Sequence, residues 1–150
     1  EIRLSLVGSE MCIRDRTLPD APLQALRPVI DHFFAQADVP SIVEQLRTVT
    51  VADSHEWARS TADLLETRSP LAMAVTLEML RHGRQLSLEQ CFALELHLDR
   101  QWFERGDLME GVRALIIDKD KTPHWNPPTL AALDADRVAS FFSGFDGSGS

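Results

Sequence analysis

The stretch "SPLAMAVTLEMLRHG", Ser69–Gly83, indicates the fold class of this 150-residue chain. Ser69 is a typical N-cap residue and Pro70 stands at the first helical position. Gly83 has the place of a C′ residue, and the two residues before it are basic, as the helix dipole favours in a last turn. The stretch therefore predicts one helix with well-defined ends.

Two further helices are predicted directly after this one. Ser87 and Gln90 match a capping box, and the helix that they open reaches about Arg105. Asp107, with a glutamate three residues later, resembles a second cap for a helix that ends near Asp118. We expect these two helices to form an antiparallel pair at the centre of the fold.

Shorter helices are predicted on both sides, with starts at Pro22, Asp38, Ser54 and Asp134. Pro28 lies within the first of them, where it either kinks the helix or marks its true first turn. Strand-like alternation is nearly absent after the first seventeen residues. The predicted fold class is all-α, with roughly six or seven helices.

The first sixteen residues, "EIRLSLVGSEMCIRDR", do not fit this organisation. They show weak alternation and no cap, and "SLVGSEMCIRDR" resembles the translation of a sequencing adapter. We therefore expect residues 1–16 to be a non-native extension; a genuine frayed terminus is the alternative. The helical region would then cover residues 17–145, and the end of the chain, residues 146–150 ("DGSGS"), is expected to be a flexible tail.

Composition excludes several classes of protein. Hydrophobic residues make up 44 % of the chain and charged residues 25 %, as in an ordinary globular protein. The formal net charge of −8 argues against nucleic-acid and anionic-membrane partners, which require a basic face. Two cysteines, Cys12 and Cys91, support neither a disulfide framework nor a zinc site, so a reducing, cytoplasmic setting is expected.

The predicted helix from Ser87 carries an anomaly. Its apolar arc contains Glu95 and Asp99 near the centre, and a buried carboxylate without a partner is costly. One interpretation is a paired acid/base site, and the other is a salt bridge that joins two helices. We favour the salt bridge and predict that Glu95 pairs with Arg113, because Arg113 lies at the edge of the next apolar face.

The run "DKDK", Asp118–Lys121, allows a metal site, a phosphate-binding site or a solvated helix end. Its carboxylates lack the further oxygen ligands of a calcium loop, and the five histidines form no i, i+4 pair. We therefore expect no metal. Lysines at a helix end suit the dipole, which favours the solvated helix end as local chemistry. No nucleophile elbow or phosphate-binding glycine loop occurs either.

Three motifs carry a resemblance to a known family: "SPLAMAVTLEMLRHGRQLSLEQC", "ELHLDRQW" and "DLMEGVRALIIDKDKTPHWNP". With them, the chain resembles the C-terminal region of the 3-hydroxyisobutyryl-CoA hydrolases, which are members of the crotonase (enoyl-CoA hydratase/isomerase) superfamily. The resemblance covers nearly everything after residue 16, and the last motif is its most specific part.

The resemblance implies an acyl-CoA thioester hydrolase of valine breakdown whose catalytic residues lie in a preceding β/α core. None of those positions occurs in this chain, so no catalytic residue and no cofactor are carried over, and the chain is expected to be an inactive fragment. It would pack against that core, with Lys119 or Lys121 near a phosphate of the CoA substrate. The alternatives are another enoyl-CoA hydratase or isomerase and a free-standing helical interaction module.

A lost core also predicts apolar side chains without cover. The residues that we expect in such an exposed patch are Leu71, Val75, Met79, Phe141 and Phe142.

Overall fold

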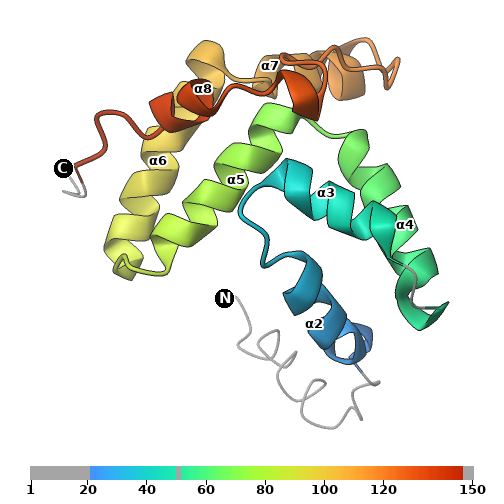
Figure 1. Ribbon diagram of the computed structural model, residues 1–150. Helices are drawn as coiled ribbons and strands as arrows, with labels where there is room; N and C mark the ends of the chain where they lie inside the picture. Colours follow the sequence, from blue (N-terminus) through green and yellow to red (C-terminus); the bar gives the residue numbers. More distant parts are fainter. Residues whose placement is uncertain (1–20, 50–51, 147–150) are drawn as a thin grey trace, which may run out of the picture. The chain divides into compact units, whose positions relative to one another are not determined.

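The computed structural model describes residues 21–49 and 52–146, and within these ranges it contains helices and loops but no strand. The predicted extension at residues 1–16 lies outside the described residues. The chain divides after His32 into two units, residues 1–32 and 33–150. Helix α2, Pro22–Phe33, runs without interruption through Pro28, which settles where this helix begins. Figure 1 shows the helices.

In the larger unit, α3 (Val39–Thr48) packs against α4 (Ala52–Glu66). Asp38 caps α3 as predicted, because its Oδ1 accepts a hydrogen bond of 2.8 Å from the Ser41 amide. Helix α4 begins at Ala52, three residues before the start that a cap at Ser54 predicts, so that prediction was wrong. The buried side chains of this helix pair are Val39, Ile42, Val43, Leu46, Ala58 and Ala62.

Helices α5 (Pro70–Gly83) and α6 (Leu88–Arg105) confirm the predicted starts. The Ser69 hydroxyl accepts a hydrogen bond from Ala72 N at 3.0 Å, and both hydrogen bonds of the Ser87–Gln90 capping box are present. The end of α5 differs from the prediction. Gly83 is the last helical residue and its φ is not positive, so it is not a left-handed C′ residue.

The main core joins α5 and α6 to α8 (Ala135–Ser140). Its fully buried side chains include Leu71 and Val75 of α5 and Phe141, which directly follows α8. The prediction that these three residues form an exposed patch was therefore wrong. The reason is local: α8 and the residue after it supply Val138 and Phe141, which cover these side chains without a separate core.

The predicted partner of α6 is a short and irregular helix. α7 covers Leu108–Val112, and a π-helical turn, Arg113–Ile117, follows it and closes with an Asp118 N to Arg113 O bond of 2.8 Å. A 3₁₀ turn, Leu130–Ala132, precedes α8. The pair predicted over residues 87–118 is present as two successive helical segments, but α5 and α8 supply the other buried residues of the main core.

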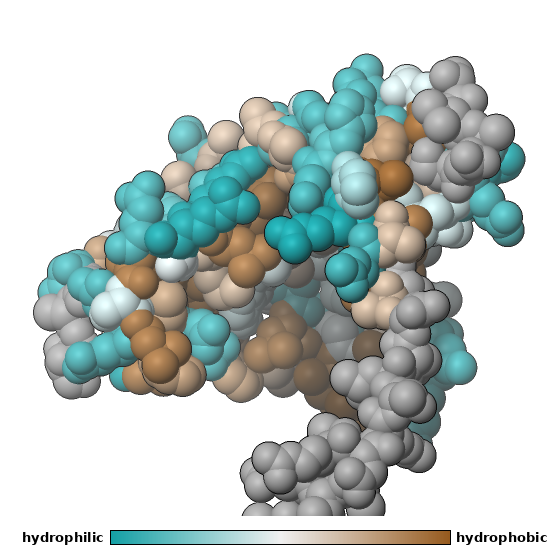
Figure 2. Space-filling view, turned by 90° about the horizontal axis from the view of Figure 1, so that it is seen from below, coloured by the Kyte–Doolittle hydropathy of each residue, from teal (hydrophilic) through white to brown (hydrophobic). Residues whose placement is uncertain are grey.

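One side of α6 remains without cover. Four large apolar side chains of this helix are more than half exposed, namely Leu88, Phe92, Leu96 and Phe103. We call these four residues the α6 face. They recur at helical spacing, which is the pattern of a side that packs against something. On the side of the molecule that Figure 2 shows, hydrophobic residues are exposed between hydrophilic ones. No helix within the described ranges is long and apolar enough to cross a membrane.

Candidate functional site

Among the residues that the structure describes, the largest group of bonded charged side chains surrounds Arg113. We call Arg113, Glu110, Asp118 and Asp120 the Arg113 cluster. The guanidinium donates to both carboxylate oxygens of Glu110, from Nε at 2.9 Å and from Nη2 at 2.7 Å. Its Nη1 donates to Asp118 Oδ2 and to Asp120 Oδ2, both at 2.7 Å.

Every N–H donor of the Arg113 guanidinium is engaged. The fifth hydrogen bond runs from Nη2 to the carbonyl oxygen of Thr122 at 3.1 Å, and an arginine side chain has five N–H groups. The bonds to charged groups are the stronger kind, and the contact with Glu110 is bidentate. The cluster therefore fixes one cation against three carboxylates, with no donor left for another partner.

The predicted ion pair between Glu95 and Arg113 was wrong. Glu95 is exposed on α6, whereas Arg113 is fully bonded within its own turn and the segment that follows. The physical reason is that the helix after Asp107 turns π-helical at Arg113, which brings the side chain over residues that follow it closely in sequence. Because Glu95 and Asp99 face solvent, they need no buried partner.

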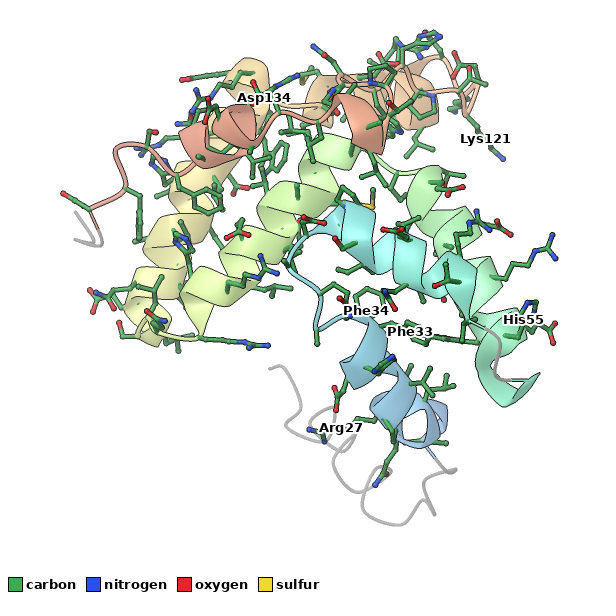
Figure 3. All side chains as sticks on the ribbon, viewed as in Figure 1. Arg27, Phe33, Phe34, His55, Lys121 and Asp134 are labelled. Carbon is green, nitrogen blue, oxygen red and sulfur yellow. The ribbon has the colours of Figure 1, made fainter. Side chains whose placement is uncertain are left out.

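Next to the cluster lies the segment Asp118–Thr122, which we call the lysine segment. Lys119 and Lys121 are exposed, and both have a positive φ, 57° and 58°. Figure 3 shows that the Lys121 side chain points away from the neighbouring ribbon. The predicted solvated helix end is thus confirmed in its exposure. The role of Asp118 and Asp120 as partners of Arg113 was missed.

Backbone contacts fasten the lysine segment as well. Lys121 N donates to Ala114 O at 3.0 Å, and Thr122 N donates to Asp120 Oδ1 at 2.9 Å. Neither lysine has an ion-pair partner among the residues that the structure describes. Their ammonium groups are therefore available to an external anion.

Asp107 connects the residues after the lysine segment to the start of α5. Its side chain is buried, Oδ2 accepts a hydrogen bond of 2.5 Å from the Ser69 hydroxyl, and Oδ1 accepts one of 3.1 Å from Asn126 N. Trp125 Nε1 adds a bond of 3.0 Å to Thr67 O. Asp107 makes no side-chain cap on α7, so the predicted capping role was wrong: both of its oxygens bind residues distant in sequence.

The positive charge of Arg113 lowers the pKa of two of its carboxylate neighbours, Glu110 and Asp120. The hydrogen bonds from Arg113, followed by the bond from the His124 amide, lower the pKa of Glu110 to about 2. Hydrogen bonding to Arg113, followed by that to Thr122, lowers the pKa of Asp120 to about 2 as well. The carboxylates in turn raise the pKa of Arg113 above its ordinary value. Glu110, Asp120 and Arg113 are therefore all charged at neutral pH.

These shifts predict an acid-sensitive fold. A carboxyl with a lowered pKa in the folded state contributes stability above its unfolded pKa, which is 4.5 for Glu110, and that stability disappears as the pH falls towards about 2. We expect the thermal midpoint of the chain to fall between about pH 5 and pH 2. In Glu110→Gln, the fall should be clearly shallower. Circular dichroism melts across this range measure it.

Glu104→Gln is the matched control for this measurement, because Glu104 is exposed and belongs to no ion pair in the described part of the chain. Its midpoint should follow the wild-type dependence on pH. Equal slopes for Glu110→Gln and the wild type would contradict the assigned role of Glu110.

Other arrangements in the described residues are poorer candidates. No group of three or more histidine, cysteine, aspartate or glutamate side chains in the searched residues is placed to hold a metal ion. An apolar groove of about 510 Å³ lies between α3, α5 and α8, and its wall includes Asp38, Glu78 and His82. Glu78 binds Arg81, and Asp38 caps α3. The polar side chains of the groove are thus largely engaged in the fold.

The geometry favours anion binding over catalysis. A carboxylate that is held by Arg113 stays ionised and makes a poor proton acceptor, because its lowered pKa opposes protonation. The two lysines, in contrast, are exposed cations on a fastened backbone. A negatively charged group is the ligand that such a pair attracts.

The family model described as enoyl-CoA hydratase/isomerase matches residues 7–142. The chain belongs to this family. The match begins at residue 7, within the stretch predicted to be non-native, and it ends just after α8. Membership confirms the resemblance that the sequence motifs carry.

Among curated members, the 3-hydroxyisobutyryl-CoA hydrolases are similar to this chain. The mitochondrial protein of Dictyostelium discoideum is 37 % identical over 114 residues, which are 75 % of this chain and 29 % of that protein. The Danio rerio counterpart is 35 % identical over 124 residues, which are 83 % of the chain and 31 % of the relative. The chain thus spans less than a third of either relative.

A solved structure of the family has the same helical arrangement. The enoyl-CoA hydratase of Rhodobacter sphaeroides 2.4.1 superposes with a TM-score of 0.77 at 30 % sequence identity, over 93 % of this chain and 40 % of that one. The all-α fold is therefore a helical region found within a crotonase-fold protein.

Proposed function

We propose that this chain is the C-terminal helical region of a 3-hydroxyisobutyryl-CoA hydrolase-like enzyme, a thioesterase of valine catabolism. The observation that carries the proposal is the similarity to two curated hydrolases of that name, at 37 % and 35 % identity over three quarters of the chain or more. The catalytic residues would lie in the part of the family fold that the chain does not span.

In this proposal, the helical region has two tasks. The α6 face packs against the β/α core, because four large apolar side chains on one side of a helix are costly to leave in water. Lys119 and Lys121 approach the phosphates of the acyl-CoA substrate, because they are exposed cations without ion-pair partners in the described residues. Neither task makes the chain itself catalytic.

The second candidate is another activity of the same family. It is favoured by the structural similarity to an enoyl-CoA hydratase, which is 30 % identical and covers more of the chain than the curated hydrolases do. Hydration adds water across a double bond and leaves the thioester intact, whereas hydrolysis releases the CoA thiol. The two candidates therefore differ in a product that is easily measured.

The experiment reads the genomic DNA upstream of codon 17 and assays any longer protein that the gene encodes. Thiol release from 3-hydroxyisobutyryl-CoA supports the hydrolase. Hydration of an enoyl-CoA without thiol release supports the second candidate. A reading frame that starts near Thr17 with no core upstream would favour the free-standing interaction module and contradict both.

A further inference from the structure

The two lysines of the lysine segment are the only lysines of the chain. Lysine and arginine together number 15, and thirteen of these residues are arginine. The two side chains are not equivalent, since a lysine ammonium is a compact charge on a flexible stem and an arginine is a planar fork. The stretch from residue 113 to residue 121 thus combines one planar guanidinium, that of Arg113, with the two ammonium groups of Lys119 and Lys121.

Both lysines hold a backbone conformation that non-glycine residues rarely adopt. Their φ angles of 57° and 58° lie in the left-handed region, and such residues persist where the surrounding structure holds them. Aspartates and lysines alternate along this segment and have different surroundings. Asp118 and Asp120 bind Arg113, whereas Lys119 and Lys121 are exposed.

The Arg113 side chain provides much of the support that fixes the backbone of the lysine segment. Arg113 binds the lysine segment at its first, third and fifth residues, Asp118, Asp120 and the carbonyl of Thr122. By engaging both aspartates, it also keeps them from pairing with the adjacent lysines, whose ammonium groups have no ion pair within the described ranges.

We propose that Arg113 is a positioning residue, which holds the lysine segment so that Lys119 and Lys121 present their ammonium groups together to the phosphates of a CoA thioester. The inference rests on the proposed function and specifies how it is achieved. Arg113 itself touches no ligand, because all five of its donors are engaged inside the protein. Pre-organisation of this kind lowers the cost of ordering flexible side chains on binding.

The first test uses endoproteinase Lys-C, which cleaves after lysine and so has two sites in this chain, both in the lysine segment. In Arg113→Gln, native-state cleavage at these sites should become about tenfold faster or more, because the segment opens more often. Asp120→Asn removes one contact and should accelerate cleavage less. Arg100→Gln removes an exposed arginine with no ion pair in the described chain, and should digest as the wild type does.

The second test measures the binding of CoA by calorimetry, with adenosine as the phosphate-free probe. We expect the wild type to bind CoA and not adenosine, and Arg113→Gln to bind CoA roughly fivefold more weakly although both lysines remain. Arg113→Lys should not restore the wild-type affinity, since lysine has three donors in place of a fork. Lys119→Gln/Lys121→Gln should abolish binding.

The outcomes test separately the positioning role of Arg113 and the assignment of CoA as the ligand of the two lysines. Unchanged Lys-C cleavage in both Arg113→Gln and Asp120→Asn, with the helical circular dichroism intact, overturns the positioning role. Faster cleavage without CoA binding by the wild type overturns the ligand assigned to the lysines. Neither result decides the hydrolase proposal, which depends on thiol release by the longer protein.

Discussion

The purified 150-residue chain is expected to release no thiol from 3-hydroxyisobutyryl-CoA above the uncatalysed background. Thioester hydrolysis requires N–H donors that face the developing oxyanion, a positioned water, and an acid or base within hydrogen-bond reach. In the described residues, the clustered carboxylates are bound to Arg113, and Glu95 and Asp99 are exposed on α6. The loss of a single oxyanion donor already costs about 10²–10³ in rate.

The assay follows free thiol with a chromogenic disulfide and compares the chain, at equal concentration, with the longer protein that we propose for the same gene. Turnover by the chain alone that disappears in Glu95→Gln or Asp99→Asn would contradict the prediction. It would establish the paired acid/base site that exposure argues against. An Arg100→Gln variant, which changes another exposed charge of the same helix, controls for an indirect effect on α6.

Phe141→Ala is expected to cost about 3–5 kcal/mol of unfolding free energy, the range for removal of a large buried aromatic side chain. Phe141 is fully buried, its ring lies 4.7 Å from that of Trp102, and the Arg105 guanidinium lies 5.1 Å above it. Its carbonyl also bonds to His97 at 2.9 Å, which ties the end of α8 to α6. Truncation leaves a cavity where these helices meet.

Urea unfolding, monitored by circular dichroism, measures the loss. The matched control is Phe103→Ala, the same change at a position on α6 that is 66 % exposed, and it should remain within about 0.5 kcal/mol of the wild type. Similar losses for the two variants would show that α8 does not cover α5 and α6 in solution. A destabilised chain with an unchanged urea slope would confirm a packing effect.

Local sequence signals predicted the helices well where a side chain and the backbone interact within one turn. The Ser87–Gln90 box and the Ser69 cap are of this kind, and the structure has both. Asp107 has the same sequence signature as a cap, yet its oxygens bind Ser69 and Asn126. A cap pattern reports what a residue can bond nearby, and a distant donor can compete for the same oxygen.

The candidate site was less predictable for a similar reason. Periodicity placed Arg113 at the edge of the apolar face of a regular helix, but residues Arg113–Ile117 form a π-helical turn, in which side chains do not follow α-helical spacing. The available signal was the arginine five residues before an Asp-Lys-Asp-Lys alternation, which allows one fork to gather both aspartates. In that geometry the backbone of Lys119 and Lys121 is left-handed, a conformation that residue propensities do not predict for lysine.

The α6 face has a consequence for whatever covers it. Glu95 and Asp99 lie on the same helix among its exposed leucine and phenylalanine side chains, and both are solvated at present. A covering surface that removed water from these carboxylates without compensation would lose more than the apolar contact returns. The complementary surface therefore needs cationic side chains opposite Glu95 and Asp99, or it must leave both carboxylates accessible to water. The two carboxylates on the apolar side of α6 therefore restrict the charge of its partner surface as well as its shape.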